Sequence, residues 1–154
     1  MMQASLGILL PLPEAPPPDF PRSDGQPELR ESTGGARGAR VIVVDDETRI
    51  AGTLVEILKG EGYEAMAAST GDGAVELARI FNPDIVLSDV ILPGLNGIEV
   101  GIQINSLFPK CRVILFSGQA ATLDLLKDAR RRGHDFEILA KPIKPAALLA
   151  IIRR

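Results

Sequence analysis

The chain has 154 residues, of which 45% are hydrophobic and 24% charged, which fits one ordinary globular domain with room for a tail. A net charge of −3, no tryptophan and 4% aromatic residues argue against a nucleic-acid partner, which needs clustered basic residues or aromatic stacking platforms. The single cysteine, Cys111, excludes an intrachain disulfide, and we expect a cytoplasmic protein.

The first 40 residues differ in composition from the rest. Seven of the 12 prolines precede residue 28, and residues 32–40 are rich in glycine. Such a segment cannot bury enough apolar surface to offset the entropy lost on ordering. We therefore expect residues 1–40 to be a disordered arm and residues 41–154 to form the one domain. The apolar stretch 6–12 is too short to cross a membrane and lacks the basic residues of a secretory signal, so no membrane insertion is expected.

From residue 41 onward, short apolar runs alternate with stretches of helical periodicity. Residues 41–44 read VIVV, a continuous apolar run typical of a strand that is buried on both faces. The spacing of apolar residues predicts a helix over 50–58, which Gly60 and Gly62 close. A weaker strand candidate follows at 63–67.

The same alternation continues to the end of the chain. We expect helices at 72–81, 96–108, 121–132 and 145–153, and strands at 85–87, 113–116 and 136–140. Five strand–helix units with apolar strands predict an α/β fold, in which helices cover both faces of a five-stranded parallel sheet. Short loops and right-handed crossovers leave few possible topologies.

Polar side chains stand at the ends of the predicted strands. Asp45 and Asp46 follow the first strand, Asp89 the third, Ser117 the fourth and Lys141 the fifth. Open parallel sheets bind ligands beyond the carboxyl ends of their strands, so we expect these side chains to converge. Carboxylates suit a hard cation such as Mg²⁺, and a carboxylate can also accept a phosphoryl group. A lysine and a hydroxyl suit the oxygens of that group.

Four stretches carry a resemblance to a known family. They are VIVVDDE at 41–47, IVLSDVILPGLNGIE at 85–99, VILFSG at 113–118 and LAKPI at 139–143. Together they resemble the receiver domain of two-component response regulators over residues 41–154, and the short chain is similar to the single-domain chemotaxis type. The resemblance implies the flavodoxin-like strand order 2-1-3-4-5.

The resemblance also implies roles for the acidic residues. Asp89 would be the phosphoacceptor, which takes a phosphoryl group from a histidine kinase or a histidine phosphotransfer protein. Asp46 and Asp89 would bind Mg²⁺ through their side chains, with Asp45 assisting. The backbone carbonyl of Ile91 would be a further ligand.

The remaining family positions concern the phosphoryl group and the switch. Lys141 would pair with the phosphoryl oxygens, and the Lys141–Pro142 peptide bond would be cis, as cis bonds are a proline phenomenon. The Ser117 hydroxyl would be drawn towards the new charge. The face built from residues 121–132, 136–140 and 145–153 would then change its preference for a downstream partner.

The sequence departs from the family pattern at one position. The family usually has Tyr or Phe three residues before the lysine, and this chain has Ile138 there. We expect Phe136 to be a core residue, and the switch to depend on the loop after the fourth strand. Ile91 and Gln119 are the two side chains expected to tune the lifetime of the phosphoryl group, since Gln119 could orient a water molecule and Ile91 could not.

The predicted function is that of a stand-alone, phosphorylation-controlled binding module that is not an enzyme, with a homodimer left open. One alternative is an Mg²⁺-dependent phosphatase that forms an aspartyl-phosphate, but such enzymes carry an acid–base Asp where this chain has Ile91. Another is a pseudo-receiver scaffold, although those typically lose site residues and none is missing here.

Overall fold

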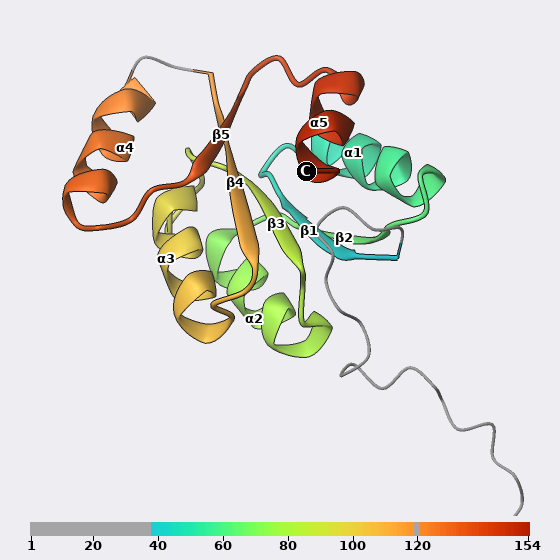
Figure 1. Cartoon of the computed structure of the whole chain (residues 1–154), viewed down its shortest axis with the longest axis horizontal. Helices are drawn as coiled ribbons and strands as arrows, with labels where there is room; N and C mark the ends of the chain where they lie inside the picture. The colour runs from blue at the N-terminus through green and yellow to red at the C-terminus, as the bar shows by residue number, and fades with distance from the viewer. Residues whose placement is uncertain (1–37, 119–120) are drawn as a thin grey trace, which may run out of the picture. The chain divides into compact units, whose positions relative to one another are not determined.

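Ten elements alternate along the chain in the computed structural model, which describes residues 38–118 and 121–154 (Figure 1). The strands are β1 (Arg40–Val44), β2 (Glu64–Ala68), β3 (Ile85–Asp89), β4 (Arg112–Ser117) and β5 (Glu137–Ala140). The helices are α1 (Thr48–Gly60), α2 (Gly71–Phe81), α3 (Gly97–Leu107), α4 (Ala121–Arg131) and α5 (Pro145–Ile152). Every predicted element is present, with ends that differ by a few residues.

The expected arm, residues 1–40, falls almost wholly outside the described residues. Within them, β1 already begins at Arg40, one residue before the predicted domain boundary. No helix of the described segments has the length and apolar character that a membrane crossing requires.

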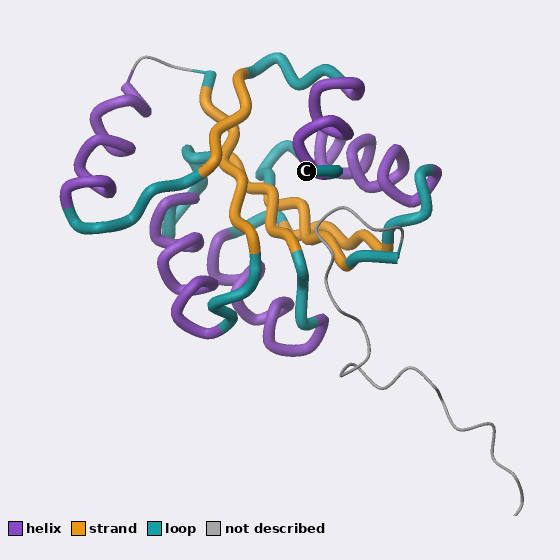
Figure 2. Tube along the Cα trace, viewed as in Figure 1, coloured by secondary structure: helices purple, strands orange, loops and turns teal. Residues whose placement is uncertain are grey.

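The five strands form one parallel sheet in the order β2-β1-β3-β4-β5, which confirms the predicted fold. Helices α1 and α5 cover one face of the sheet, and α2, α3 and α4 cover the other (Figure 2). Since successive side chains of a strand point to opposite faces, Val41 and Val43 pack under α1 and α5, while Ile42 and Val44 pack under α2 and α3.

Burial follows the position of each strand in the sheet. Residues 41–44 of β1 and residues 85–87 of β3 are buried on both faces, as predicted from their continuous apolar runs. The edge strands β2 and β5 have several exposed positions. Phe136 is buried, as expected of a core residue, and it lies just before β5 rather than within it.

Arg112, the first residue of β4, joins β4, β5 and α5 at the edge of the sheet where the strands begin. Its Nη2 and Nε donate to the two carboxylate oxygens of Glu137 on β5, at 2.7 and 3.0 Å. Its Nη2 and Nη1 also donate to the carbonyl oxygens of Ile151 and Ile152 at the end of α5, at 3.0 and 3.2 Å. A planar guanidinium satisfies this set better than a point charge, and the set fixes α5 against β4 and β5.

Helix α3 begins in contact with the backbone that ends β3. Gly97 N donates to Val90 O at 2.9 Å, and Asn96 Oδ1 accepts from Glu99 N at 3.0 Å as the N-cap. A Cβ atom on Gly97 would lie 2.0 Å from Asp89 O. Glycine at this position therefore lets the helix close on the strand end that carries Asp89.

We expect Gly97→Ala to lower the free energy of unfolding by about 1–3 kcal/mol, because the added methyl group must displace backbone. Urea denaturation measures this change. Gly52→Ala in α1 is the matched control: nothing lies within 4 Å of its Cβ position, so the change should stabilise the helix by about 0.5–1 kcal/mol. Equal effects of the two substitutions would contradict the role assigned to Gly97.

Candidate functional site

Three of the five polar residues predicted from the strand ends, Asp46, Asp89 and Lys141, line one cleft, and Asp45 and Ser117 contact residues that line it. Asp45 comes directly after β1, Asp89 ends β3, Ser117 ends β4 and Lys141 follows β5. The cleft has a volume of about 590 Å³. It is lined by Asp46, Glu47, Ile50, Asp89, Ile91, Gly118, Thr122, Lys141 and Pro142.

Three carboxylates meet at the cleft floor. One oxygen each from Asp45, Asp46 and Asp89 lies within 4.8 Å of the others. Their exposure is graded: Asp45 is fully buried, the Asp89 side chain is 14% exposed, and Asp46 is exposed. Because adjacent residues at a strand end point to opposite sides, the two consecutive aspartates lie in different environments.

The two carboxylate oxygens of Asp45 differ in their hydrogen bonding. Its Oδ1 accepts from Glu47 N at 2.9 Å. Its Oδ2 is buried and accepts no hydrogen bond from any described residue, with Lys141 Nζ at 3.8 Å. A buried carboxylate oxygen without a hydrogen bond is costly, and a cation is the partner that would satisfy it.

The charge state of Asp45 reflects this position. Burial raises the pKa of its carboxyl above the ordinary value of 3.8, and the charges of Asp89 and Asp46 add to this effect. The N–H of Glu47 and the ammonium of Lys141 act in the opposite direction and do not cancel it. Folding therefore makes the ionised form of Asp45 less favourable than it is in water.

Lys141 supplies the positive charge of the cleft. Its Nζ donates to Asp89 Oδ2 at 2.8 Å. Burial acts to lower the pKa of the Lys141 ammonium, but the hydrogen bond and charge of Asp89 and the charge of Asp45 outweigh it, so the pKa is raised. The Lys141–Pro142 peptide bond is cis, as predicted. A Cβ on Gly118 would lie 3.0 Å from Lys141 Cβ, so glycine leaves room for the lysine stem.

The Ser117 hydroxyl is bonded to a residue that the sequence did not single out. Its Oγ forms a hydrogen bond with Thr122 Oγ1, in the first turn of α4. Thr122 is only 1% exposed and lines the cleft. A threonine in the first turn of a helix looks like an ordinary cap in the sequence, so nothing local distinguished it.

The sequence singles out three further positions, namely Ile91, Gln119 and Ile138. Ile91 lines the cleft with a side chain that is 45% exposed, and its N–H donates to Asp89 Oδ1 at 3.3 Å. The role of its carbonyl as a metal ligand stays a prediction. Gln119 lies outside the described residues. Ile138 is 42% exposed on β5.

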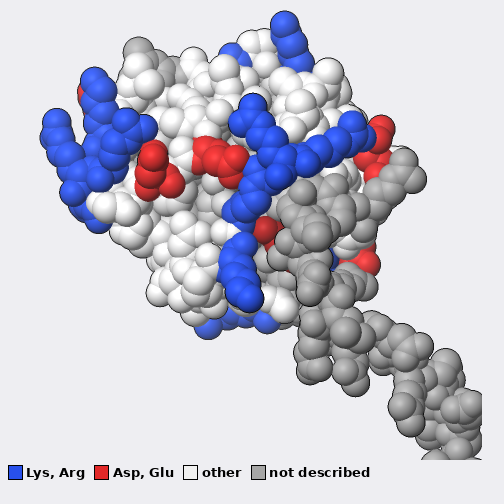
Figure 3. Space-filling model, viewed as in Figure 1, with Lys and Arg blue, Asp and Glu red and all other residues white. Residues whose placement is uncertain are grey.

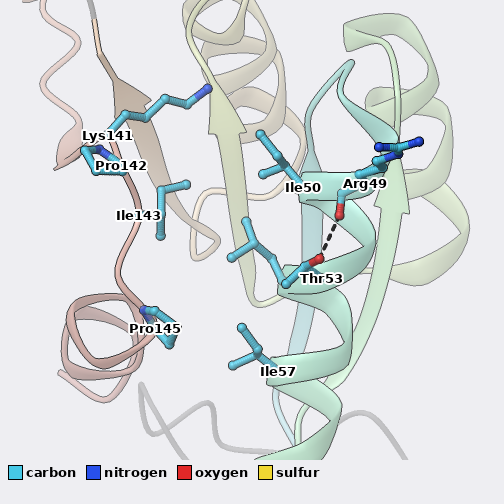
Figure 4. Close-up of a pocket in the computed structure, with 9 residues that line it drawn as sticks. Arg49, Ile50, Thr53, Ile57, Lys141, Pro142, Ile143 and Pro145 are labelled. Atoms are coloured by element: carbon cyan, nitrogen blue, oxygen red, sulfur yellow. Dashed lines mark hydrogen bonds between the residues drawn. The ribbon is translucent and has the colours of Figure 1, made fainter.

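A second, more apolar groove adjoins the cleft (Figure 4). Ile50 and Ile57 of α1 lie on one side of it. They face Ile143, in the segment that links β5 to α5, and Pro145, the first residue of α5. Its volume is about 360 Å³. Besides these four residues, it is lined by Arg49, Thr53, Leu54, Lys141 and Pro142, so the two hollows share Ile50, Lys141 and Pro142.

These features define a class of protein, an open parallel α/β sheet with an acidic cleft, a lysine and a hydroxyl at the carboxyl edge of its strands. The family model described as the response regulator receiver domain matches residues 41–153. The chain belongs to this family, whose members are parts of two-component systems.

Curated relatives agree with the family and differ in length. The DNA-binding response regulator MtrA of Mycobacterium tuberculosis is 33% identical over 116 residues, which cover 74% of this chain and 49% of that protein. The chain thus spans about half the length of the curated relatives it matches. These relatives are named as DNA-binding proteins, so they do not support the prediction that nucleic acid is not a partner.

Solved structures are similar across the same region. A receiver domain protein from Clostridium thermocellum has a TM-score of 0.67 and 28% identity, covering 74% of this chain and 90% of that one. The receiver domain of the sensor histidine kinase PA1611 from Pseudomonas aeruginosa has a TM-score of 0.63 and 25% identity, covering 76% of this chain and 96% of that one. It holds a magnesium ion in its active-site cleft.

We expect Asp45→Asn to raise the free energy of unfolding in EDTA at pH 7 by about 0.5–2 kcal/mol, the usual gain from relieving one unfavourable feature. The pKa of Asp45 is raised on folding, so its carboxyl stabilises the fold less as the pH rises above 3.8. The advantage of Asn should therefore grow from acid towards neutral pH.

Urea denaturation across that range measures the difference. Asp46→Asn is the matched control, because an exposed side chain should change the free energy of unfolding by less than about 0.5 kcal/mol. A destabilised Asp45→Asn protein at pH 7 would count against the account of Asp45.

Proposed function

We propose that the chain accepts a phosphoryl group on Asp89 from a phosphohistidine donor and, in response, changes its binding to a downstream protein in the cytoplasm. One observation carries this proposal. Lys141 Nζ lies 2.8 Å from Asp89 Oδ2 at the floor of a cleft that is open to solvent. A carboxylate nucleophile and a fixed cation at one point are what phosphoryl transfer requires.

The transfer step is a simple exchange of bonds. A carboxylate oxygen of Asp89 attacks the phosphorus of the donor, the nitrogen–phosphorus bond breaks, and its electron pair returns to the imidazole. The Lys141 ammonium balances charge on the equatorial oxygens as they pass into the cleft. The group leaves by hydrolysis: a water oxygen attacks phosphorus, the bond between phosphorus and the Asp89 oxygen breaks, and its electron pair returns to the carboxylate. The water gives up a proton to solvent as inorganic phosphate is released.

The donor set fits Mg²⁺. Asp45, Asp46 and Asp89 offer the oxygen ligands that this ion prefers, and Asp45 Oδ2 is a buried oxygen that accepts no hydrogen bond from the described residues. The Ile91 carbonyl remains the predicted fourth protein ligand. When bound, the ion would supply further positive charge for the phosphoryl oxygens.

The alternatives are less well supported. A phosphatase acting on outside phosphoesters needs an acid–base group two residues after the nucleophile, and Ile91 has none. A scaffold without phosphorylation gives no reason for the ion pair between Lys141 and Asp89. Stand-alone action stays a prediction, since the matched relatives are about twice as long.

The proposed donor surface is the groove beside the cleft. A donor protein must bring its phosphohistidine to Asp89 while the rest of its surface rests nearby. The groove shares Ile50, Lys141 and Pro142 with the cleft and adds half-buried aliphatic side chains, among them Ile57 and Ile143. Apolar surface of this kind is typical of the centre of a protein interface.

The proposed output surface is the face of α4, β5 and α5. Leu123 and Leu125 on α4 are 53% and 37% exposed, and Ile138 on β5 is 42% exposed. Basic side chains gather over α4 (Figure 3), whose last turn carries Arg130 and Arg131. A partner with an apolar patch beside acidic residues would complement this face.

We expect incubation with a small acyl phosphate and Mg²⁺ to add the mass of one phosphoryl group, and Asp89→Asn to abolish the gain. EDTA should slow the reaction by about 100-fold or more, since a metal ion supplies several kcal/mol of charge stabilisation. Intact-protein mass spectrometry follows both.

Asp135→Asn is the matched control, because its side chain is 74% exposed and lies outside the cleft; it should react like wild type. Continuous release of phosphate would favour the phosphatase, and the absence of any mass gain in wild type would favour the scaffold.

We expect Ile57→Asp to slow transfer from a histidine phosphotransfer protein by about tenfold, the typical loss when one apolar interface anchor is replaced. Its reaction with a small acyl phosphate should be unchanged, since Ile57 lines the groove and not the cleft. Ile80→Asp on α2, where the side chain is 86% exposed, is the control. Equal rates for Ile57→Asp and wild type with the protein donor would rule out the groove.

A further inference from the structure

We propose that Thr122 is a positioning residue that transmits the phosphorylation of Asp89 to helix α4 through the Ser117 hydroxyl. The inference rests on the proposed function. Its structural basis is the hydrogen bond between Ser117 Oγ and Thr122 Oγ1, which connects the end of β4 to the first turn of α4 across the wall of the cleft.

The direction of this hydrogen bond is open before phosphorylation. Each hydroxyl can donate one proton and accept others, and either oxygen of the pair can be the donor. The two side chains can therefore exchange roles without moving far.

A phosphoryl group on Asp89 would fix the direction, because its oxygens only accept hydrogen bonds. The Ser117 hydroxyl must then donate to a phosphoryl oxygen, and its own oxygen is left to accept from Thr122. A charge-assisted hydrogen bond of this kind is roughly twice as strong as one between neutral groups. The result is a chain that runs from Thr122 through Ser117 to the phosphoryl group, in which each bond polarises the next.

Helix α4 is the element that such a chain can move most easily. Among its described side chains, only Thr122 and Ala129 are buried. An element with few buried contacts shifts at a low cost in free energy. The hydroxyl pair is therefore one of the few contacts of the described residues that fix the start of α4.

The departure at Ile138 makes this link more important. The side chain of Ile138 has no polar atom and is already 42% exposed, so it cannot form a hydrogen bond to the Ser117 hydroxyl. The threonine hydroxyl provides a polar route from the site to the output face that does not involve β5.

The test compares Thr122→Val, which keeps the shape and loses the hydroxyl, with Thr122→Ser, which keeps the hydroxyl. Each protein is treated with a small acyl phosphate and Mg²⁺, and mass spectrometry gives the phosphorylated fraction. Amide chemical shifts of residues 122–131 are then compared for the phosphorylated species alone.

In wild type and in Thr122→Ser, these shifts should move on phosphorylation. In Thr122→Val, the population of the shifted α4 should fall by about fivefold, the change that one hydrogen bond makes to an equilibrium. Ser117→Ala should show the same loss in its phosphorylated species, and the double variant should lose no more, because both substitutions break one chain.

Three outcomes would overturn the proposal. They are a wild-type response in Thr122→Val, an equal loss in Thr122→Val and Thr122→Ser, and additive losses in the double variant.

If Thr122→Val does not fold, the comparison of Ser117→Ala with Thr122→Ser decides, because a full response in Ser117→Ala excludes the chain of hydrogen bonds. If wild type gains no phosphoryl mass, the proposed function fails and the relay fails with it; a phosphorylated wild type without the predicted loss refutes the relay alone.

Discussion

The structure depends on one electrostatic constraint, which is that three carboxylates meet at the edge of a sheet with one ammonium between them. Asp45 is buried and fixed by Glu47 N–H, so it cannot turn towards solvent. Lys141 must then lie close to both Asp45 and Asp89, at 3.8 and 2.8 Å. One lysine cannot neutralise three acids, and the cleft keeps an excess of negative charge that favours a cation. Proteins commonly retain such local conflicts at functional sites and compensate for them elsewhere in the fold.

Much of the fold follows from local signals that agree with each other. The runs VIVV, IVL and VILF lie in the three inner strands, where both faces are covered and every side chain can be apolar. The edge strand β2 gave a weaker signal, because its sequence EAMAA has one neighbouring strand and several exposed positions. Once the strand ends are predicted, the candidate site residues can be predicted too. All parallel strands end at the same edge of the sheet, so the polar residues that follow them lie near one another.

The sequence could not show how those residues are embedded. Asp45 and Asp46 are the same residue type at adjacent positions, and only the packing of the sheet makes one buried and the other exposed. The Ser117–Thr122 contact depends on where α4 begins in space, which no local pattern specifies. Ile50 and Ile57 occur at the spacing of ordinary core residues, and only the distance between α1 and the segment after β5 leaves them partly open in a groove.

The same constraint explains why a hydroxyl pair suits this chain as the signal path. In the proposed function, a phosphoryl group would change the cleft by adding charge. Polar groups respond to charge by reorienting their dipoles, whereas an apolar side chain responds only when space is made or removed. Ile138 is an apolar side chain of the second kind, whereas Ser117 and Thr122 are polar groups whose hydrogen bond joins the end of β4 to α4 at the cleft. Because the described side chains of α4 have little buried surface to oppose a shift, the proposed change at Asp89 would reach the exposed leucines and arginines of that helix at a low cost in free energy.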